Sequence, residues 1–108
     1  SRMASSTAPN LYAKVVNLVG VSFRTLPVDS RELFAKAGKE SSSVLREIAG
    51  GCGLSEAAVL STCNRFEVIS VGEDAEQSIT EFFERQARRP LKDGEIYRLR
   101  NRDAVRHL

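Results

Sequence analysis

The distribution of apolar and polar positions along the chain predicts four strands separated by helices. Four segments are rich in Val, Leu and Ile, or alternate apolar with polar residues, over strand length. The expected strands cover residues 13–22, 57–61, 65–71 and 96–99. Between the first and second strands, and again between the third and fourth, apolar residues recur three and four positions apart, which favours helices.

The starts and ends of the first two helices are predicted from polar and glycine residues. We expect one helix to begin at a capping box formed by Asp29 and Glu32 and to be interrupted at Gly38. A second should take its N-cap from the serines at 41–43 and end at the glycine pair 50–51. The apolar residues that these helices turn inward are Leu33, Phe34, Ala37, Val44, Leu45 and Ile48.

A third helix is predicted between the last two strands. Asp74 and Gln77 form another capping box at its start, and Pro90 closes it. Its apolar stripe consists of Ile79, Phe82, Phe83 and Ala87. After the fourth strand, Asn101 is expected to cap a short helical segment at 102–108.

This order of elements, strand-helix-strand followed by strand-helix-strand, is typical of a ferredoxin-like α+β sandwich (βαββαβ). In that fold, helices pack on one face of a mostly antiparallel sheet. We assign residues 13–100 to the domain. Residues 1–12 are expected to be vector-derived residues and a flexible leader, and 101–108 to start a helix that leads to downstream domains absent from this chain.

A chain of 108 residues can bury one core without a disulfide or a structural metal. The two cysteines, Cys52 and Cys63, and the one histidine, His107, lie at spacings that match neither a metal site nor a disulfide framework. We therefore expect a reducing, cytoplasmic location and no bound metal. No apolar run approaches the roughly 20 residues of a membrane span.

Positive charge is concentrated in the C-terminal quarter of the chain. Residues 84–106 hold eight basic and four acidic side chains, whereas the other positions hold eight basic and ten acidic ones. Such a stripe could contact phosphates, or it could be a solvated face crossed by salt bridges. The sequence leaves both interpretations open.

The most distinctive chemistry lies in the segment Ser-Thr-Cys-Asn-Arg at 61–65, which directly follows an apolar strand. A lone cysteine is more often a small core residue, but burying the neighbouring Arg65 without a partner would be costly. Asn64 tolerates the left-handed backbone of a sharp turn, and a guanidinium near a thiol favours the thiolate. These residues predict a nucleophilic Cys63 on a turn at the end of the sheet. Cys52, between two glycines, is expected to be inert.

This segment resembles the catalytic motif of the glutamyl-tRNA reductases, oxidoreductases of tetrapyrrole (porphyrin) biosynthesis. The resemblance implies that Cys63 attacks the aminoacyl ester of glutamyl-tRNA and that NADPH reduces the resulting thioester to glutamate-1-semialdehyde. It also implies that Arg65 holds the side-chain carboxylate of glutamate, although Arg65 could instead brace the turn against Glu67. His107 would border the site and orient the substrate or move a proton. We assign catalysis to Cys63 and His107, and substrate binding to Thr62, Asn64, Arg65 and Glu67.

Two further segments extend the resemblance over residues 14–108. Gly20–Pro27 is similar to the N-terminal signature of the family, but Phe23, Arg24 and Leu26 stand where histidine, lysine and alanine are usual. Phe23 has no group that can transfer a proton. The residues at 104–108 also look like a family segment.

No dinucleotide site is expected within the chain. The run Gly-Cys-Gly at 51–53 begins like a glycine fingerprint, but the third glycine position falls on Glu56, and a strand follows where a helix is required. The resemblance therefore implies that NADPH binds a domain absent from this chain. It also implies a full-length parent that is a homodimer through absent domains.

A function of another class is compatible with the same predicted fold, namely a non-catalytic ferredoxin-like RNA-binding or regulatory module in which Cys63 is structural. RNA-reading sheets of this topology usually carry surface aromatics for base stacking. The five Phe and two Tyr residues of this chain fall mostly at apolar positions of the pattern. The sequence therefore favours the enzyme.

Overall fold

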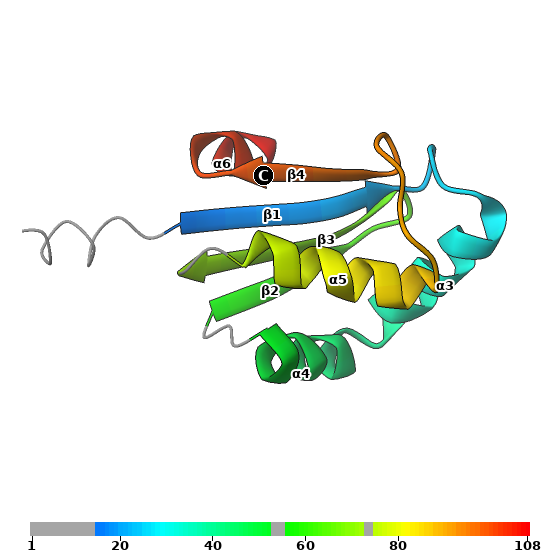
Figure 1. Ribbon diagram of the computed structural model, residues 1–108, viewed down its shortest axis with the longest axis horizontal. Helices are drawn as coiled ribbons and strands as arrows, with labels where there is room; N and C mark the ends of the chain where they lie inside the picture. Colours follow the sequence, from blue (N-terminus) through cyan, green and yellow to red (C-terminus); the bar gives the residue numbers. More distant parts are fainter. Residues whose placement is uncertain (1–14, 53–55, 73–74) are drawn as a thin grey trace, which may run out of the picture.

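The computed structural model describes residues 15–52, 56–72 and 75–108 (Figure 1). Its strands are β1 (Val15–Ser22), β2 (Glu56–Ser61), β3 (Arg65–Gly72) and β4 (Ile96–Arg100). Its helices are α3 (Val28–Lys39), α4 (Ser41–Cys52), α5 (Glu76–Ala87) and α6 (Arg102–His107). The predicted leader at 1–12 lies outside the described residues. Every helix within those residues is too short or too polar to reach across a membrane.

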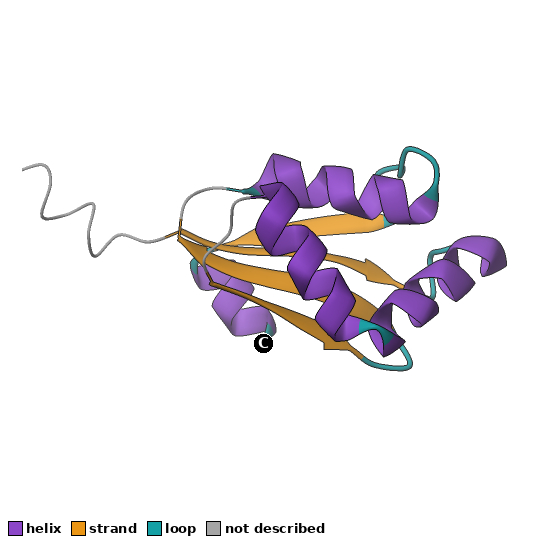
Figure 2. Ribbon diagram, turned by 90° about the horizontal axis from the view of Figure 1, so that it is seen from below, coloured by secondary structure: helices purple, strands orange, loops and turns teal. Residues whose placement is uncertain are grey.

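The four strands form one sheet in the order β2-β3-β1-β4, and each neighbouring pair is antiparallel. Helices α3, α4 and α5 cover one face of this sheet. The short helix α6 lies against the other face, beside β4 and β1 (Figure 2). The predicted ferredoxin-like α+β class is therefore confirmed, with one additional helix on the second face.

The helix-covered face of the sheet carries the hydrophobic core. Strand alternation turns Val19 of β1 and Val68 of β3 towards the helices, where both are fully buried. The rings of Phe34, Phe66 and Phe83 contact one another with centroid distances of 5.5 or 5.6 Å. Burying one such side chain contributes about 1.5–3 kcal/mol, so this aromatic group fixes α3 and α5 on the sheet.

The predicted capping boxes are wrong. Helix α3 begins one residue before Asp29, directly after Pro27, and no side chain caps it. Proline at this position fixes the entry of the chain into the helix, so Asp29 falls in the first turn, where its charge meets the helix dipole. At the start of α5, Ala75 holds the N-cap position, and Gln77 instead donates to a glutamate one turn later. Asp74 lies outside the described residues.

Gly38 does not interrupt α3, which continues past it. A Cβ at Gly38 would lie 2.0 Å from Oγ of Ser61, so the close approach of α3 to β2 requires glycine there. Ser41 begins α4 as expected, but its hydroxyl donates to the carbonyl of Gly38 at 2.8 Å. Helix α4 also runs past the glycine pair at 50–51 and ends at Cys52.

Asn101 precedes α6 at the predicted position, but its side chain pairs with β1 and does not cap the helix. Its Oδ1 accepts from the N–H of Val16 at 3.1 Å, and its own N–H donates to the carbonyl of Val16 at 2.8 Å. Helix α6 is thereby tied to β1. It buries Ala104 and leaves Val105 and Leu108 exposed.

The basic stripe of the C-terminal quarter is partly neutralised in the fold. Arg89 donates from its two terminal nitrogens to both carboxylate oxygens of Glu95, each at 2.9 Å, and to Oγ of Ser30 at 3.2 Å. Arg98 donates to Oγ1 of Thr80 at 3.0 Å. At Arg89 the salt-bridged interpretation of the stripe therefore holds, and the ion pair joins the turn before β4 to α3.

Acid should weaken the fold through Glu95. The Arg89 guanidinium and the backbone N–H of Lys92 lower the pKa of Glu95 to about 2. A carboxyl whose pKa is lower in the folded state than its ordinary 4.5 stabilises the fold at pH values above 4.5. This contribution disappears as the pH falls towards the pKa of the folded state. In urea denaturation, Glu95→Gln should therefore show a flatter pH dependence of unfolding free energy between about pH 5 and pH 2. Glu47→Gln is the control, because Glu47 and Arg85 form an exposed pair at 3.8 Å. Equal flattening in both variants would contradict this role of Glu95.

Candidate active site

The turn between β2 and β3 is held by the side chain of Thr62. Its Oγ1 accepts hydrogen bonds from the N–H groups of Asn64 and Arg65, both at 3.1 Å, and its own N–H donates to the Arg65 carbonyl at 2.8 Å. Asn64 does not adopt the left-handed backbone that asparagine tolerates, because among the described non-glycine residues only Arg88 and Asn101 have positive φ. The Thr62 hydroxyl closes the turn instead.

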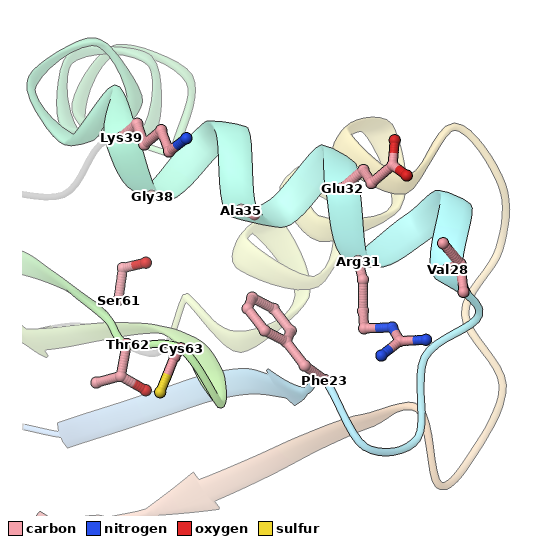
Figure 3. A pocket seen from close by; sticks show the side chains of 10 residues that line it. All are labelled: Phe23, Val28, Arg31, Glu32, Ala35, Gly38, Lys39, Ser61, Thr62 and Cys63. Atoms are coloured by element: carbon pink, nitrogen blue, oxygen red, sulfur yellow. The ribbon is translucent and has the colours of Figure 1, made fainter.

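Cys63 stands on this turn and is exposed. The carbonyl of the next residue, Asn64, accepts a hydrogen bond from the N–H of Phe23 at 2.9 Å, which fixes the loop between β1 and α3 beside the turn. Cys63 and Phe23 both border a cleft of about 780 Å³ that is also lined by α3 and the end of β2 (Figure 3). Cys63 is therefore not a core residue, and its thiol is accessible to a ligand.

A second group of polar side chains lies on the opposite face of the sheet, against α6. Glu67 is fully buried, and its Oε2 accepts from the Tyr97 hydroxyl and lies 2.6 Å from Nε2 of His107. Nη1 of Arg65 lies 2.9 Å from the same Nε2 and 3.8 Å from Oε2 of Glu67. Arg65 and Glu67 share this face because they alternate along β3 with the core residue Phe66. We call Arg65, Glu67, Tyr97 and His107 the Glu67 cluster.

The Glu67 cluster brings a cation and a carboxyl group to one imidazole nitrogen. Nε2 of His107 donates to Glu67 when it carries a proton and accepts from Arg65 when it does not, so the two hydrogen bonds are alternatives. Burial and the hydrogen bond to Glu67 raise the pKa of Tyr97 far above its ordinary value, so its hydroxyl remains a donor. The other oxygen of Glu67, Oε1, is buried and has no hydrogen-bond partner among the described residues. The imidazole is therefore held between a cation and a carboxyl group.

Gly20 makes room for the contact between Glu67 and Tyr97. It is paired with Glu67 on β3 and with Tyr97 on β4. A Cβ at position 20 would lie 2.7 Å from Cγ of Glu67 and 2.8 Å from Cζ of Tyr97. The cluster therefore requires a residue without a side chain between these two groups.

Gly20→Ala should destabilise the chain by about 1–3 kcal/mol, because the added methyl group displaces Glu67 or Tyr97 from a packed position. Gly50→Ala is the matched control. Apart from its chain neighbours and the backbone of its own helix, a Cβ at Gly50 in α4 would meet no atom of the described residues within 4 Å, so alanine there should raise helix stability by about 0.5–1 kcal/mol. Urea unfolding of both variants measures the difference. Equal effects would show that the space at Gly20 is not limiting.

The structure divides the predicted site residues between two places. Arg65, Glu67 and His107 meet in the Glu67 cluster. The contact of Arg65 with Glu67 there is the one expected if Arg65 braces the turn instead of binding substrate. Thr62 and Cys63 border the cleft on the helix-covered side of the sheet.

Asn64 is exposed, and its backbone rather than its side chain joins the turn to its neighbours. The side chain of Cys52 lies outside the described residues, so its inertness stays a prediction. Sequence reasoning missed Tyr97. Alternation with Ile96 in the predicted fourth strand sets Tyr97 on the second face, but its partner becomes visible only once β4 is paired with β1.

The described residues do not fit a dinucleotide cofactor. The phosphates of such cofactors bind at a glycine-rich turn from a strand into a helix. The residues at 50–52 instead end α4 and lead towards β2, and the described strand-to-helix connections at 23–27 and 101 contain no glycine. Nor do three His, Cys, Asp or Glu side chains of the described ranges gather in a metal-binding arrangement.

Comparison with known proteins identifies related chains. Residues 19–108 match the family model described as glutamyl-tRNA(Glu) reductase, N-terminal domain. The chain is 35% identical over 96 residues to glutamyl-tRNA reductase of Desulfatibacillum aliphaticivorans, covering 84% of the chain and 22% of the relative. It is 38% identical over 91 residues to the enzyme of Xanthomonas campestris pv. phaseoli, covering 84% of the chain and 21% of the relative.

A solved structure of glutamyl-tRNA reductase from Methanopyrus kandleri is similar with a TM-score of 0.59 and 28% identity, over 85% of this chain and 20% of that one. The chain spans about a fifth of the length of the relatives it matches. From the family model, the identities and the shared fold together, we conclude that the chain belongs to the glutamyl-tRNA reductase family and corresponds to its N-terminal domain.

Proposed function

We propose that this chain carries out the glutamyl-transfer half of the glutamyl-tRNA reductase reaction. The observation that carries the proposal is the position of Cys63, exposed on a turn that Thr62 holds and two residues from Arg65. The guanidinium of Arg65 in turn meets Glu67 and His107. A thiol so placed can reach a substrate, and the cation near it can bind an anion.

In the proposed step, the thiolate of Cys63 attacks the ester carbonyl carbon of glutamyl-tRNA. A carbon–sulfur bond forms, the bond from the carbonyl carbon to the terminal ribose oxygen breaks, and that oxygen leaves with the tRNA after taking a proton. Arg65, with 45% of its side chain exposed, holds the side-chain carboxylate of glutamate in a two-pronged contact. His107, whose Nε2 lies 2.9 Å from Nη1 of Arg65, orients the glutamyl group beside Arg65, and the leaving oxygen takes its proton from water.

Reduction of the thioester needs a hydride, and the described residues do not fit a nicotinamide cofactor. We therefore assign NADPH binding to residues outside this chain. The formation of glutamate-1-semialdehyde for tetrapyrrole synthesis is assigned to the longer protein for the same reason.

Mass spectrometry of the chain after incubation with glutamyl-tRNA tests this function. We expect one glutamyl group on the peptide that contains Cys63, and hydroxylamine should remove it because it is a thioester. NADPH added to the mixture should stay unoxidised. A glutamyl group on Cys52, or folded chain that stays unmodified beside intact glutamyl-tRNA, would overturn the proposal.

The alternative of a non-catalytic RNA-binding module has less support. RNA-binding sheets of this topology stack bases on aromatic side chains of the open sheet face. On that face of this sheet, Tyr97 donates to Glu67, and its ring lies 5.5 Å, centroid to centroid, from the ring of His107 in α6. The Tyr97 ring is therefore engaged within the fold rather than presented for stacking.

A further inference from the structure

The cleft beside Cys63 has no occupant in the step described above. Arg65 and His107, which hold the glutamyl group, lie on the opposite face of the sheet, whereas the cleft opens between α3 and the end of β2 (Figure 3). We propose that the cleft binds the 3′-terminal adenosine of glutamyl-tRNA, with the ring of Phe23 as the stacking surface for the base. This inference rests on the proposed function.

The chemistry of the ester directs the nucleoside towards the cleft. The ester carbonyl carbon is bonded to the α-carbon of glutamate and to the ribose oxygen. These two substituents point in different directions. When the carbonyl lies at Cys63 and the glutamate side chain reaches Arg65, the ribose points away from Arg65. The cleft lies on that other side of Cys63, towards the helix-covered face.

Phe23 has the properties of a stacking residue. One part of its side chain packs against the core, so the ring is fixed, and another part lines the cleft. The hydrogen bond from its N–H to Asn64 ties its position to the turn that carries Cys63. In Figure 3 the ring lies between α3 and that turn. A rigid aromatic ring at fixed distance from the nucleophile suits a base, because every base has a π-face.

The charges around the cleft suit the phosphate that precedes the terminal nucleoside. Arg31 and Lys39 line the cleft from α3, and Glu32 is the acidic residue among the lining side chains described. Within the described residues, neither Arg31 nor Lys39 forms an ion pair. Both cations are therefore available to a phosphate. A volume of about 780 Å³ lies within the usual range of small-molecule sites.

Two glutamyl donors separate nucleoside binding from thiol chemistry. The first is glutamyl-tRNA, and the second is the glutamyl α-thioester of N-acetylcysteamine, which has no nucleoside. Phe23→Leu should slow capture from subsaturating glutamyl-tRNA about 5- to 150-fold, the range for loss of one stacked base. Capture from the small thioester should be unchanged. Phe23→Trp, which keeps an aromatic surface, should retain capture from both donors.

The ratio of the two rates is independent of how much protein is folded, so partial unfolding of a variant cannot imitate the expected result. Equal slowing with both donors would overturn the proposal, because Phe23 would then act on the thiol or on the fold. Unchanged capture from glutamyl-tRNA by Phe23→Leu would overturn it as well. Unaltered protein that captures glutamate from neither donor would instead overturn the proposed function itself.

Substitutions of the basic residues of α3 test the proposed phosphate contact. Replacing Arg31 and Lys39 together by alanine should slow capture from glutamyl-tRNA and weaken its dependence on salt concentration. Lys36→Ala is the matched control, since Lys36 is an exposed basic residue of α3 that does not line the cleft. An equal loss in the control would contradict a phosphate site in the cleft.

Discussion

Cys63→Ser is expected to reduce glutamyl capture at least about 1,000-fold, the order of loss when a nucleophile is removed. A serine hydroxyl is a weak nucleophile unless a neighbouring base removes its proton. The one imidazole of the chain, His107, lies on the other face of the sheet, within 2.6 Å of Glu67. The measurement is the rate at which labelled glutamate becomes attached to the protein in a single turnover.

Cys52→Ser is the control for this substitution, because it makes the same exchange of sulfur for oxygen away from the turn. It should leave the rate unchanged. Since Cys63 is exposed, its replacement should alter the free energy of unfolding by no more than about 0.5 kcal/mol. Undiminished capture by Cys63→Ser would remove this cysteine from the mechanism.

Arg65→Lys should lower capture from glutamyl-tRNA about 10- to 150-fold, which corresponds to about 1.5–3 kcal/mol for a charge-assisted contact. Lysine keeps the positive charge, but its single ammonium group replaces the planar guanidinium. The side-chain carboxylate of the substrate glutamate therefore loses one of two parallel hydrogen bonds. The loss should be much smaller with tRNA carrying glutamine, whose side chain is neutral. Rates with the two aminoacyl-tRNAs measure this discrimination.

A stability measurement separates binding from bracing at Arg65. Its contact with Glu67 spans 3.8 Å and its side chain is half exposed, so the lysine variant should stay folded with little change in unfolding temperature. Arg24→Lys, an exposed arginine in the loop after β1, is the control for the exchange itself. A large loss of stability with unchanged kinetics of the folded fraction would assign Arg65 to the architecture.

The strands could be predicted because their signal is repeated along each segment. In β1 and β3, the alternation that buries Val19 and Val68 also sets Arg65 and Glu67 on the opposite face, and a period of two residues is read directly from the sequence. The helix starts failed because their signals rest on single residues. At α3 the fixed φ of Pro27 overrides the capping pattern of Asp29.

The candidate site could be predicted where its contacts are local. The run from Thr62 to Arg65 is one turn, and its composition indicates exposed, polar chemistry at Cys63. The role of Gly20 could not be predicted from the sequence. The need for glycine there is evident only when its neighbours on two other strands are known. Gly38 was misread for the same reason: its obstacle, Ser61, belongs to a strand 23 positions away in the chain.

The Glu67 cluster joins residues that lie far apart in the sequence. Glu67 and His107 are 40 residues apart, and the pair that anchors α6, Val16 with Asn101, is 85 residues apart. Contacts of such separation close long loops, which costs entropy before any contact repays it. The hydrogen bonds that shape the Cys63 turn span only two or three residues. The turn that carries Cys63 is therefore shaped by local contacts, whereas the surroundings of Arg65 are complete only with α6, which follows β4, in place.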